Sequence, residues 1–467
     1  MQYRTYEEHL RAYLETLPIQ TLRILGRRQG VPKKNLAKKA LIIQSIADIF
    51  TGRAEPDIQT NRGAPVKNDY LDPEIMSRLF NIRREHDDDW DKEIESPILE
   101  VASPDAKKRP PVKPISTGLV EMQPNGTGIL HKKYGKISRA DDCLLPPVLI
   151  QTYEIRNGDY ISCHIQDTAA GEALTVERVL SINEQVVGQF QSRAQFERLT
   201  PDYPRDKIEL SANCNSAALR MIDLFAPIGR GQRALIVAPP HTGNTTLLRE
   251  ISCAIIDHHS SAIQLIVLLL DARPEDVTEF NREVGYYALD LLYSTFDEGA
   301  EEHIRVAQLA IEHAKRYAEQ GRNVMLLCDS LTKLDRAYRS FMSSQEAEIG
   351  VKQFFGAARN TLEEGSITML ATVGTEENGT ERSLYLQLKD ACNAEIVLSE
   401  ELARDGIFPA VDLKKSGTRK QSMLLSEDET AAANAIRSES KSTQTLLKHM
   451  KRTKNNQDLV AQILSKA

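Results

Sequence analysis

One short segment constrains the fold of this chain more than any other: an apolar run that leads through prolines and a glycine into a helix-forming run. In ALIVAPPHTGNTTLLREI we expect a strand over residues 234–238, a turn, and a helix that begins at Thr245. A turn between a buried strand and a helix is typical of parallel α/β sheets and offers backbone N–H groups to an anion. Because strand-like and helix-like runs continue to alternate, we predict an α/β domain with a mostly parallel sheet over residues 205–425.

Length, charge and cysteine content limit what surrounds this domain. A chain of 467 residues has room for about three domains. Its formal net charge of −7 excludes general nucleic-acid binding by the whole surface, so such binding requires local basic patches. The chain starts without an apolar signal segment, and no run approaches the ~20 apolar residues of a membrane helix. Since the six cysteines also lack paired spacing, we expect a cytoplasmic protein with no membrane partner.

A basic helical module is expected at the start of the chain, over residues 1–50. Met1 to Lys67 contains twelve Lys and Arg against six Asp and Glu. Apolar residues at helical spacing on both sides of Gly30 and Pro32 predict two helices around a turn, similar to small SAP-like nucleic-acid-binding modules. The candidate RNA- or DNA-binding cations are Arg27, Arg28, Lys33, Lys34, Lys38 and Lys39. The alternatives are a solvated basic face or a hairpin that docks on protein.

Composition changes mark three further regions. Residues 51–114 combine an acidic run with the proline-rich KKRPPVKP, which predicts a charged linker. Residues 115–190 contain short alternating strands with hairpin-like turn signals at 124–126 and 157–159, and we expect a five-stranded barrel of the OB or cold-shock kind. Residues 426–467 predict a helical tail. The tail carries the basic residues Lys441, Lys448, Lys451, Arg452 and Lys454.

Several longer motifs follow one another in a fixed order along the second half of the chain. They are PIGRGQR, RPE followed by Val and Glu, STFDE, RAY, FFGAARN and SGTRK. By these motifs the chain resembles the family of transcription termination factor Rho, bacterial hexameric RecA-type RNA translocases, over about residues 115–425. The module at residues 1–50 is likewise similar to the Rho N-terminal module. The resemblance implies ATP and Mg²⁺ as cofactors and RNA as a partner.

The turn after residue 238 departs from the family pattern at its charged positions. A phosphate-binding loop requires glycine for the turn, a lysine for the β- and γ-phosphates, and a Ser or Thr hydroxyl for Mg²⁺. The candidate cofactor-binding residues are His241, Thr242, Gly243, Asn244, Thr245 and Thr246. The resemblance places lysines at His241 and Asn244 and the metal-side hydroxyl at Thr245. Because neither replacement supplies an ammonium group, we predict severely weakened binding of ATP and Mg²⁺, and no cofactor where no residual binding survives.

A second position, on another strand, departs independently. The resemblance places a catalytic glutamate, which activates the attacking water, at Ala272. Its neighbour Asp271 faces the other side of the strand and is a poor substitute. The resemblance also assigns Asp329 to the metal side, Arg273 to phosphate sensing, and Arg419 to an arginine finger that reaches the nucleotide of a neighbouring subunit. The alternatives are a strand-end cap for Asp329 and interface ion pairs for the two arginines. The two losses predict a protein deficient in ATP hydrolysis.

The RNA-contacting face of the barrel is also altered relative to the family. Thr127, Ile129 and Leu144 stand where the resemblance places aromatic side chains on which bases stack, a contact worth about 1–3 kcal/mol per base. We expect Ile129 and Leu144 to serve the core of the barrel instead. Tyr134 and Tyr153 are candidate replacements for the lost aromatic groups.

Both loops that line the central channel in the family differ here. The first, before FFGAARN, is shorter than the family's Gly-rich loop. The second keeps the candidate RNA-binding residue Lys389, but Asp390, Ala391 and Cys392 replace Gly-Thr-Gly. Asp390 adds a negative charge where RNA phosphates would pass.

These observations predict an RNA-associated ring protein of the Rho type that is deficient in ATP hydrolysis. We expect it to regulate transcription termination by self-assembly or by co-assembly with an active Rho. Two alternatives stay open: an active ATP-dependent RNA translocase, and an oligomeric nucleic-acid-binding module. The implied partners are RNA or DNA, bound weakly through the N-terminal module, further copies or an active Rho in a closed or open ring, and RNA polymerase.

Overall fold

The computed structural model describes most of the chain outside the linker. The described residues are 6–17, 19, 22, 23, 25, 38–50, 115–131, 142–166, 174–187, 193–212, 216–260, 262–284, 290–375, 380–439 and 442–465. The predicted linker at 51–114 and the cations Arg27, Arg28, Lys33 and Lys34 lie outside them. The chain divides into two units, Met1–Pro110 and Pro111–Ala467. Among the described helices, none has the length and apolar character to cross a membrane.

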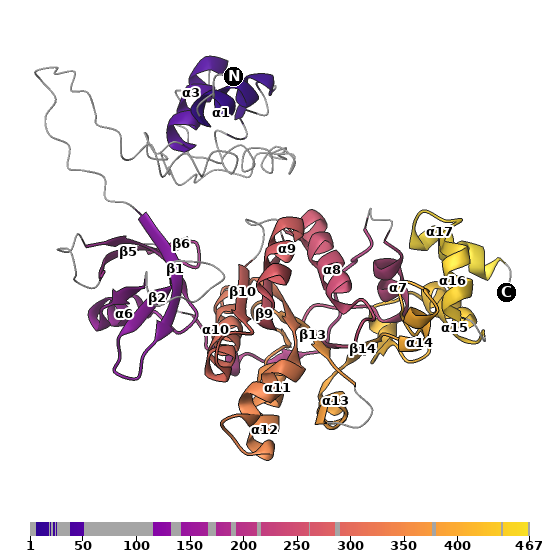
Figure 1. The fold of residues 1–467 in the computed structure, drawn as a ribbon. Helices are drawn as coiled ribbons and strands as arrows, with labels where there is room; N and C mark the ends of the chain where they lie inside the picture. The colour runs from indigo at the N-terminus through magenta and orange to yellow at the C-terminus, as the bar shows by residue number, and fades with distance from the viewer. Residues whose placement is uncertain are drawn as a thin grey trace, which may run out of the picture. The chain divides into compact units, whose positions relative to one another are not determined.

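The first unit is helical where it is described. Its main helices are α1 (Tyr6–Thr16) and α3 (Lys39–Phe50) (Figure 1). Leu10 and Leu14 of α1 and Ile42 and Ile46 of α3 are fully buried. Each pair is four residues apart and therefore lies on one face of its helix, which explains why the two helices pack together.

The second unit begins with a curled antiparallel sheet. Its elements are β1 (Ile115–Met122), β2 (Gly128–His131), β3 (Cys143–Leu145), α6 (Pro147–Tyr153), β4 (Tyr160–Ile165), β5 (Val176–Ile182) and β6 (Gln185–Val186). The strand order is β3-β2-β1-β4-β5-β6. A bridge between Leu144 and Thr175 connects β3 to the β5 side, so the sheet curls into an OB-like half-barrel. The two-residue β6 pairs with the end of β5 and adds a sixth strand to the five predicted.

The two turn signals of this region have different outcomes. Residues 124–126 join β1 to β2 in a hairpin, and Gly126 has φ +81°, which favours glycine. Residues 157–159 do not form a hairpin, because they connect α6 to β4. Gly158 has φ +82°, and a Cβ there would lie 2.5 Å from backbone atoms of Glu312 and His313. The second turn therefore packs against the helix that contains these two residues, a contact that the sequence pattern could not indicate.

The larger part of the second unit is built on a seven-stranded sheet of order β10-β9-β11-β13-β8-β14-β15 (Figure 1). The strands are β8 (Arg233–Val237), β9 (Ile263–Ala272), β10 (Asp290–Thr295), β11 (Asn323–Asp329), β13 (Ile367–Val373), β14 (Ala394–Val397) and β15 (Gly417–Thr418). All neighbouring pairs are parallel except the one between β14 and the edge strand β15. The predicted α/β class with a mostly parallel sheet, preceded by helices and a small barrel-like sheet, is confirmed.

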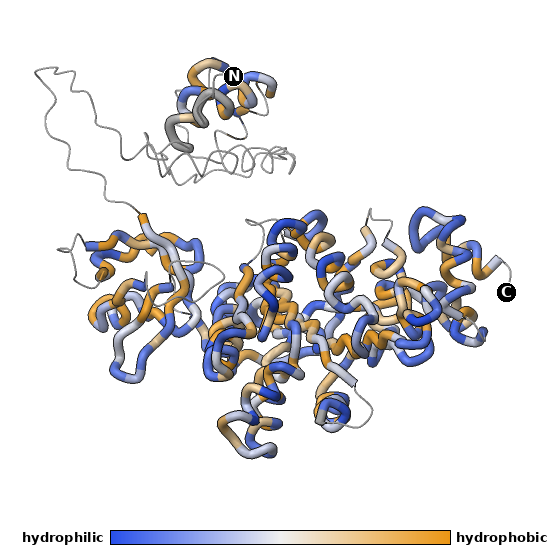
Figure 2. The backbone as a smooth tube through the Cα atoms, viewed as in Figure 1, coloured by the Kyte–Doolittle hydropathy of each residue, from blue (hydrophilic) through white to orange (hydrophobic). Residues whose placement is uncertain are grey.

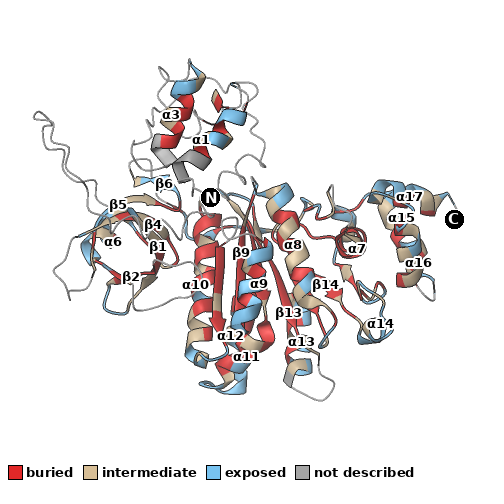
Figure 3. Cartoon of the chain, turned by 45° about the horizontal axis from the view of Figure 1, so that its top comes forward, coloured by how far each residue is buried: buried red, intermediate tan, exposed pale blue. Residues whose placement is uncertain are grey.

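Helices cover both faces of this sheet. They are α7 (Ala217–Phe225), α8 (Asn244–His259), α9 (Pro274–Val284), α10 (Ala300–Ala318), α11 (Leu331–Arg339), α12 (Ser344–Gly356), α13 (Thr380–Ala391) and α14 (Glu400–Arg404). Alternate residues of β8 belong to different core clusters: Ala234 and Ile236 pack with α8 and α9, and Leu235 and Val237 with α10, α11 and α13. Both faces are thus buried, which explains the continuous apolar runs of these strands (Figures 2 and 3).

The tail after residue 425 forms three helices, α15 (Glu427–Arg437), α16 (Ser442–Met450) and α17 (Asn456–Leu464). Their apolar residues, among them Leu446 and Leu459, join the same core cluster as Leu219 and Ile222 of α7. The tail is therefore packed against the α/β sheet unit on the side of α7 (Figure 3).

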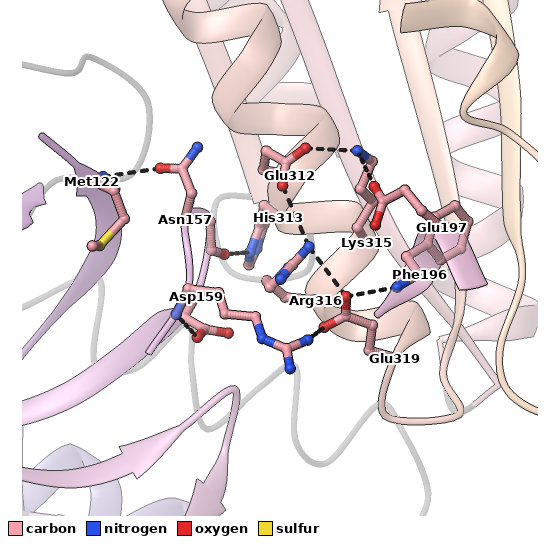
Figure 4. Close-up of polar contacts among 12 residues, drawn as sticks. Met122, Asn157, Asp159, Phe196, Glu197, Glu312, His313, Lys315, Arg316 and Glu319 are labelled. Carbon is pink, nitrogen blue, oxygen red and sulfur yellow. Dashed lines mark hydrogen bonds and ion pairs between the residues drawn. The ribbon is translucent and has the colours of Figure 1, made fainter. Parts of the chain in front are cut away.

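A group of charged side chains, here called the junction cluster, joins the half-barrel to α10 (Figure 4). It comprises Asp159, Arg193, Arg156, Glu319 and His313. Asp159 is fully buried, and its carboxylate accepts hydrogen bonds of 2.5 and 2.8 Å from Arg193. Arg156 Nη1 lies 3.1 Å from Glu319 Oε2, and His313 Nδ1 donates to the carbonyl of the barrel turn at 2.8 Å. The buried charges are paired and hydrogen-bonded, as burial requires.

Candidate nucleotide site

Predicted site residues at the ends of three strands lie at one edge of the large sheet. Strands β8, β9 and β11 run parallel, so their carboxyl ends lie on the same side. The turn 239–245 follows β8, Ala272 ends β9 and Asp329 ends β11. Ligands of open α/β sheets bind in the crevice outside the carboxyl ends of the strands. We call this region the carboxyl edge.

The turn after β8 keeps the backbone of a phosphate-binding loop. Gly243 is the N-cap of α8 with φ +92°, and His241 has φ +62°. The Thr242 hydroxyl donates to the carbonyl of Pro239 at 2.7 Å, and its side chain is buried. Thr242 therefore fixes the turn and is not exposed to a ligand. The N-terminus of the sixteen-residue α8 presents free backbone N–H groups and the positive end of a helix dipole.

The side chains around this backbone supply little positive charge. His241 and Thr246 are exposed, and Gly243, Asn244 and Thr245 are half-buried. The residues present fit a phosphate group at the helix N-terminus through backbone N–H groups, with the Thr245 hydroxyl on the metal side. None of the six predicted cofactor-binding residues carries an ammonium group that could balance a triphosphate.

The two other strand ends differ in how their side chains are held. Asp329 accepts a hydrogen bond of 2.8 Å from the hydroxyl of Thr372 on β13. It does not cap the following helix, since Ser330 does so by accepting from the backbone of Lys333. Ala272 is buried and pairs with Thr295 of β10. Ala272 thus offers only a methyl group at the carboxyl end of β9.

The remaining acidic and basic groups of this edge stand beside Ala272. Asp271 has φ +47° and is partly exposed, and Arg273 is exposed immediately before α9. Neither side chain has a hydrogen-bonded partner among the residues that the structure describes. Arg273 is therefore available to an anion, and the side chain of Asp271 contacts no other polar group of the described residues.

Sequence reasoning did not identify one aromatic residue at the carboxyl edge. Phe408 lies in the loop after α14 and is 56% exposed. Its Cε1 lies 3.9 Å from the position that a Cβ on Gly243 would occupy. An exposed ring next to a phosphate-binding turn offers a flat apolar surface to a ligand. The only sequence signal was an aromatic residue before a proline in a short loop.

Arg419 lies at the opposite edge of the sheet. It directly follows the edge strand β15, and its backbone N–H donates to Asn393, the residue before β14. The amide of Asn393 in turn accepts from the backbone N–H of Arg233, the first residue of β8. The turn 239–245 follows the other end of β8, whose five residues span roughly 16 Å. The backbone of Arg419 is therefore displaced by the length of a strand from the phosphate-binding turn of its own chain.

The edge that carries Arg419 has a cavity of about 380 Å³, here called the Arg419 pocket. It is lined by Tyr203, Pro204, Gln232, Arg233, Asp390, Ala391, Cys392, Asn393, Arg419, Lys420 and Met423. Arg419 is exposed and donates to the carbonyl of Lys389 at 3.3 Å, and it forms no ion pair with any described residue. Burial, together with the neighbouring cations Arg359 and Arg419, lowers the pKa of Arg233. The pocket is thus an electropositive surface at the sheet edge.

Lys389, the predicted RNA contact, stands at the end of α13 next to Arg419. Its ammonium group donates to the hydroxyl of Tyr385 at 3.1 Å and lies 3.5 Å from a carboxylate oxygen of Glu395. Burial raises the pKa of Cys392 to about 11, so the thiol stays protonated, and it donates to the carbonyl of Lys389. The structure therefore brings Lys389 and Arg419 together, but part of the charge of Lys389 is already neutralised.

The first channel segment is a helical hairpin. α11 ends at Arg339, and α12 begins after Ser343, which forms a capping box with Glu346. Arg339 links the two helices by ion pairs with Asp335 and Glu348. The segment before FFGAARN is thus helical, and an ion pair between Arg339 and Glu348 connects α11 to α12.

The barrel positions that lack aromatic residues lie together. Ile129 of β2 pairs directly with Leu144 of β3, and Thr127 immediately precedes β2. Leu144 is 40% exposed and Ile129 is half-buried, so the expectation that both serve the core is wrong. Their neighbours on the two strands point inward instead, because side chains alternate along a strand. Tyr153 packs against the core of the half-barrel, and Tyr134 lies outside the described residues.

Two of the six N-terminal cations are described. Lys38 is exposed, and Lys39 donates to the carbonyl of Glu15 at 2.7 Å. Lys39 therefore also makes a contact within the helical module. Within the described ranges, no group of three or more His, Cys, Asp and Glu side chains could hold a metal ion.

Comparisons with known proteins agree with this geometry. A model of the nucleotide-binding domain of the ATP synthase alpha/beta family matches residues 218–418. Transcription termination factor Rho of Borreliella burgdorferi is 38% identical over 361 residues, which cover 73% of this chain and 69% of that protein. The Rho factor of Streptomyces coelicolor is 37% identical over 377 residues, covering 76% and 88%. A solved ATPase from the type III secretion system of pathogenic bacteria matches with 24% identity and a TM-score of 0.46, covering 54% of this chain and 71% of that one.

Proposed function

This chain belongs to the family of transcription termination factor Rho, and we propose that it regulates termination through its subunit surfaces while hydrolysing little or no ATP. The observation that carries the proposal is the contrast between a preserved turn and its missing chemical groups. Gly243 still has the φ of a phosphate-binding turn, yet Asn244 and Ala272 replace the cation and the carboxylate that hydrolysis requires.

The nucleotide chemistry follows from the groups that remain. When bound, ATP with Mg²⁺ supplies the phosphoryl group and the metal for hydrolysis. The backbone N–H groups at the start of α8 would hold a phosphate, and Thr245 and Asp329 would face the metal. Without an ammonium group the triphosphate is poorly neutralised, and Ala272 has no oxygen with which to orient water. Removal of a single preorganised charge of this kind costs about 10²–10³ in rate, so two losses leave little turnover.

Arg419 supports the second half of the proposal. Its backbone is about one strand length from the phosphate-binding turn of its own chain, and it forms no ion pair with a described residue. A guanidinium exposed at a sheet edge is suited to reach a phosphate of a neighbouring subunit. In a ring with an active Rho, this chain would complete a neighbour's site while its own site stays unproductive. RNA polymerase is a further candidate partner of such a ring.

RNA binding is proposed to be weak and to depend on salt. The cations of the N-terminal module provide charge without a stacking platform, and the pair Ile129 and Leu144 offers apolar contact without aromatic stacking. Phosphate neutralisation alone gives affinity that falls steeply with salt concentration. We therefore place RNA or DNA binding mainly in residues 1–50.

The test is to titrate the chain into a termination assay driven by an active Rho while native mass spectrometry follows ring composition. We expect mixed rings and reduced termination. The Arg419→Ala variant should still enter mixed rings. The extent to which it reduces termination should differ from that of the unmodified chain. Arg404→Ala is the matched control, because Arg404 is an exposed arginine whose one ion pair among the described residues is with Glu400 on its own helix. Absence of mixed rings together with unchanged termination would contradict the proposal.

A further inference from the structure

A groove between α12 and α13 plays no part in the nucleotide chemistry described above. Both helices pack on the same face of the large sheet, because their buried residues belong to one core cluster (Figures 1 and 3). The groove has a volume of about 570 Å³. It is lined by Lys352 of α12 and by Ser383, Leu386, Gln387, Asp390 and Ala391 of α13. We call it the α12–α13 groove.

The helices beside this groove expose large apolar side chains. Ile349 of α12 and Leu386 of α13 are 50% and 54% exposed. Phe341 and Met342, in the turn between α11 and α12, are also exposed. Single exposed apolar side chains are common on protein surfaces, but several on one helical hairpin and on the helix packed against it indicate a contact surface.

On each helix a charged residue follows the exposed apolar residue by one turn, and the two charges have opposite signs. Lys352 comes three residues after Ile349, and Asp390 comes four residues after Leu386, so each pair shares one helix face. Lys352 and Asp390 are exposed, and neither forms an ion pair with a residue that the structure describes. They are the two charged members of the groove lining.

Charged residues next to this pair are already neutralised within the chain. Glu348 lies 3.2 Å from Arg339, and Lys389 lies 3.5 Å from Glu395. The charges of Lys352 and Asp390 therefore stay available to a second molecule, whereas those of Glu348 and Lys389 are partly used.

The pattern of this surface is complementary to itself. A two-fold axis between two identical molecules makes every contact reciprocal, because residue i of one copy meets residue j of the other and the reverse. An axis along the groove would bring the Lys352 side of one copy opposite the Asp390 side of the other. The same rotation would bring Ile349 opposite Leu386. RNA fits this surface less well, because Asp390 repels phosphates and the aliphatic side chains offer no stacking.

We propose that a second copy of this chain docks on the α12–α13 groove in a two-fold contact. Lys352 of each copy pairs with Asp390 of the other, and Ile349 and Leu386 cover one another. Burial of the apolar side chains supplies the affinity, and the charge pairs fix the register, because exposed ion pairs add little affinity of their own. The contact uses neither the turn before α8 nor Arg419, so it does not depend on the proposed role in termination.

The first test is zero-length carbodiimide cross-linking of the full-length chain in an equimolar mixture of unlabelled and isotopically labelled protein. An amide bond between Lys352 and Asp390 that joins the two isotopic forms arises only from a contact between copies. Mass spectrometry of the digested product measures its yield. We expect this product from the unmodified chain, and Leu386→Ser should lower its yield at least about fivefold because an apolar contact is lost.

The second test uses charge reversal, with dimer formation followed by sedimentation velocity. Lys352→Asp and Asp390→Lys each place like charges opposite one another and should raise the Kd of the dimer at least about tenfold. An equimolar mixture of the two variants again has opposite charges at both positions, and its Kd should return to within about threefold of the parent value. The matched controls are Lys414→Asp and Asp405→Lys, which reverse exposed charges outside the groove and should leave the Kd unchanged.

Thermal unfolding of each variant verifies that the chain remains folded. The proposal is overturned if the unmodified chain gives no cross-link between copies at Lys352 and Asp390. It is also overturned if the mixture of the two reversed variants dimerises no better than either variant alone. Neither result would affect the proposed function, since mixed rings with an active Rho are measured in a separate assay.

Discussion

The carboxyl edge of the large sheet and the junction cluster differ in the charged side chains that they contain. At the carboxyl edge Gly243 keeps a positive φ in the turn after β8, and neutral residues, Asn244 and Ala272, stand at the start of α8 and at the end of β9. At the junction, Asp159 and Arg193 are both buried and form a two-bond ion pair. Charges are thus buried in pairs at the junction cluster, whereas these two positions at the carboxyl edge carry no charge. The difference fits the proposal that this chain keeps its fold without the groups that ATP hydrolysis requires.

The largest expected effect comes from restoring the charges of the carboxyl edge. We predict that His241→Lys, Asn244→Lys and Ala272→Glu together raise RNA-stimulated ATP turnover by on the order of 10³-fold. The lysines neutralise the triphosphate and the glutamate orients water. Asn244→Lys alone should improve ATP binding with little gain in turnover, because Ala272 still lacks a carboxylate. Steady-state phosphate release with and without poly(C) RNA measures both. Equal turnover in the triple variant and the parent chain would show that the turn itself is distorted.

At the junction cluster, by contrast, removal of a charge should lower the stability of the fold. Arg193→Ala leaves the buried carboxylate of Asp159 without its cation and is expected to lower the free energy of unfolding by about 3–5 kcal/mol. His241→Ala, at the exposed turn, should change it by less than about 0.5 kcal/mol. Urea denaturation followed by circular dichroism compares the two. Similar small losses would mean that the junction ion pair is not structurally required.

A glycine pair tests whether the half-barrel truly packs on α10. Gly158 and Gly126 both have φ near +80°, but only at Gly158 would a Cβ overlap backbone atoms of α10. We expect Gly126→Ala to cost about 1 kcal/mol from backbone strain alone. Gly158→Ala should cost at least about 1 kcal/mol more, because the overlap forces the turn away from the helix. Identical melting temperatures for the two variants would argue against this contact.

The smallest expected effect is a change in stability at acid pH, at a further contact between the half-barrel and α10. Glu121 lies 2.8 Å from His131 and 2.6 Å from Arg305 of α10. Burial alone would raise the pKa of Glu121, but the hydrogen bond from His131 and the charge of Arg305 lower it below its usual 4.5. This carboxylate therefore stabilises the fold above pH 4.5, and the contribution is lost as the pH falls through its lowered pKa.

Glu121→Gln should accordingly lower the free energy of unfolding by about 0.5–1 kcal/mol at neutral pH. The difference from the parent chain should shrink as the pH falls below 4.5 and through the lowered pKa of Glu121. Urea denaturation at a series of pH values measures the difference directly. A difference that grows toward acid pH would contradict the sign of this shift.

The sequence predicted the sheet class and the order of its parts because both depend on local patterns. Continuous apolar runs such as the one over β9 indicate strands buried on both faces, and glycine after a strand indicates the turn. Contacts between residues that are far apart in the sequence leave no local pattern of this kind. The turn 157–159 packs on α10, Arg220 binds the tail, and Phe408 stands beside Gly243. Each depends on tertiary packing between segments far apart in the sequence.

The candidate site was predictable only in part for the same reason. Missing charges at Asn244 and Ala272 are visible in the residue types themselves. The outward position of Leu144 was not, since an apolar side chain on a short strand fits either face until the strand register is known. The placement of Arg419 at the edge opposite the turn required the strand order.

We propose that this chain keeps the Rho fold without effective ATP hydrolysis. The most direct test is to measure RNA-stimulated ATP turnover by the unmodified full-length chain, with an authentic Rho and the triple variant measured beside it. We expect no turnover above background for the unmodified chain, with or without poly(C) RNA, and clear turnover for both comparison proteins. Turnover by the unmodified chain at a rate similar to that of authentic Rho would contradict it.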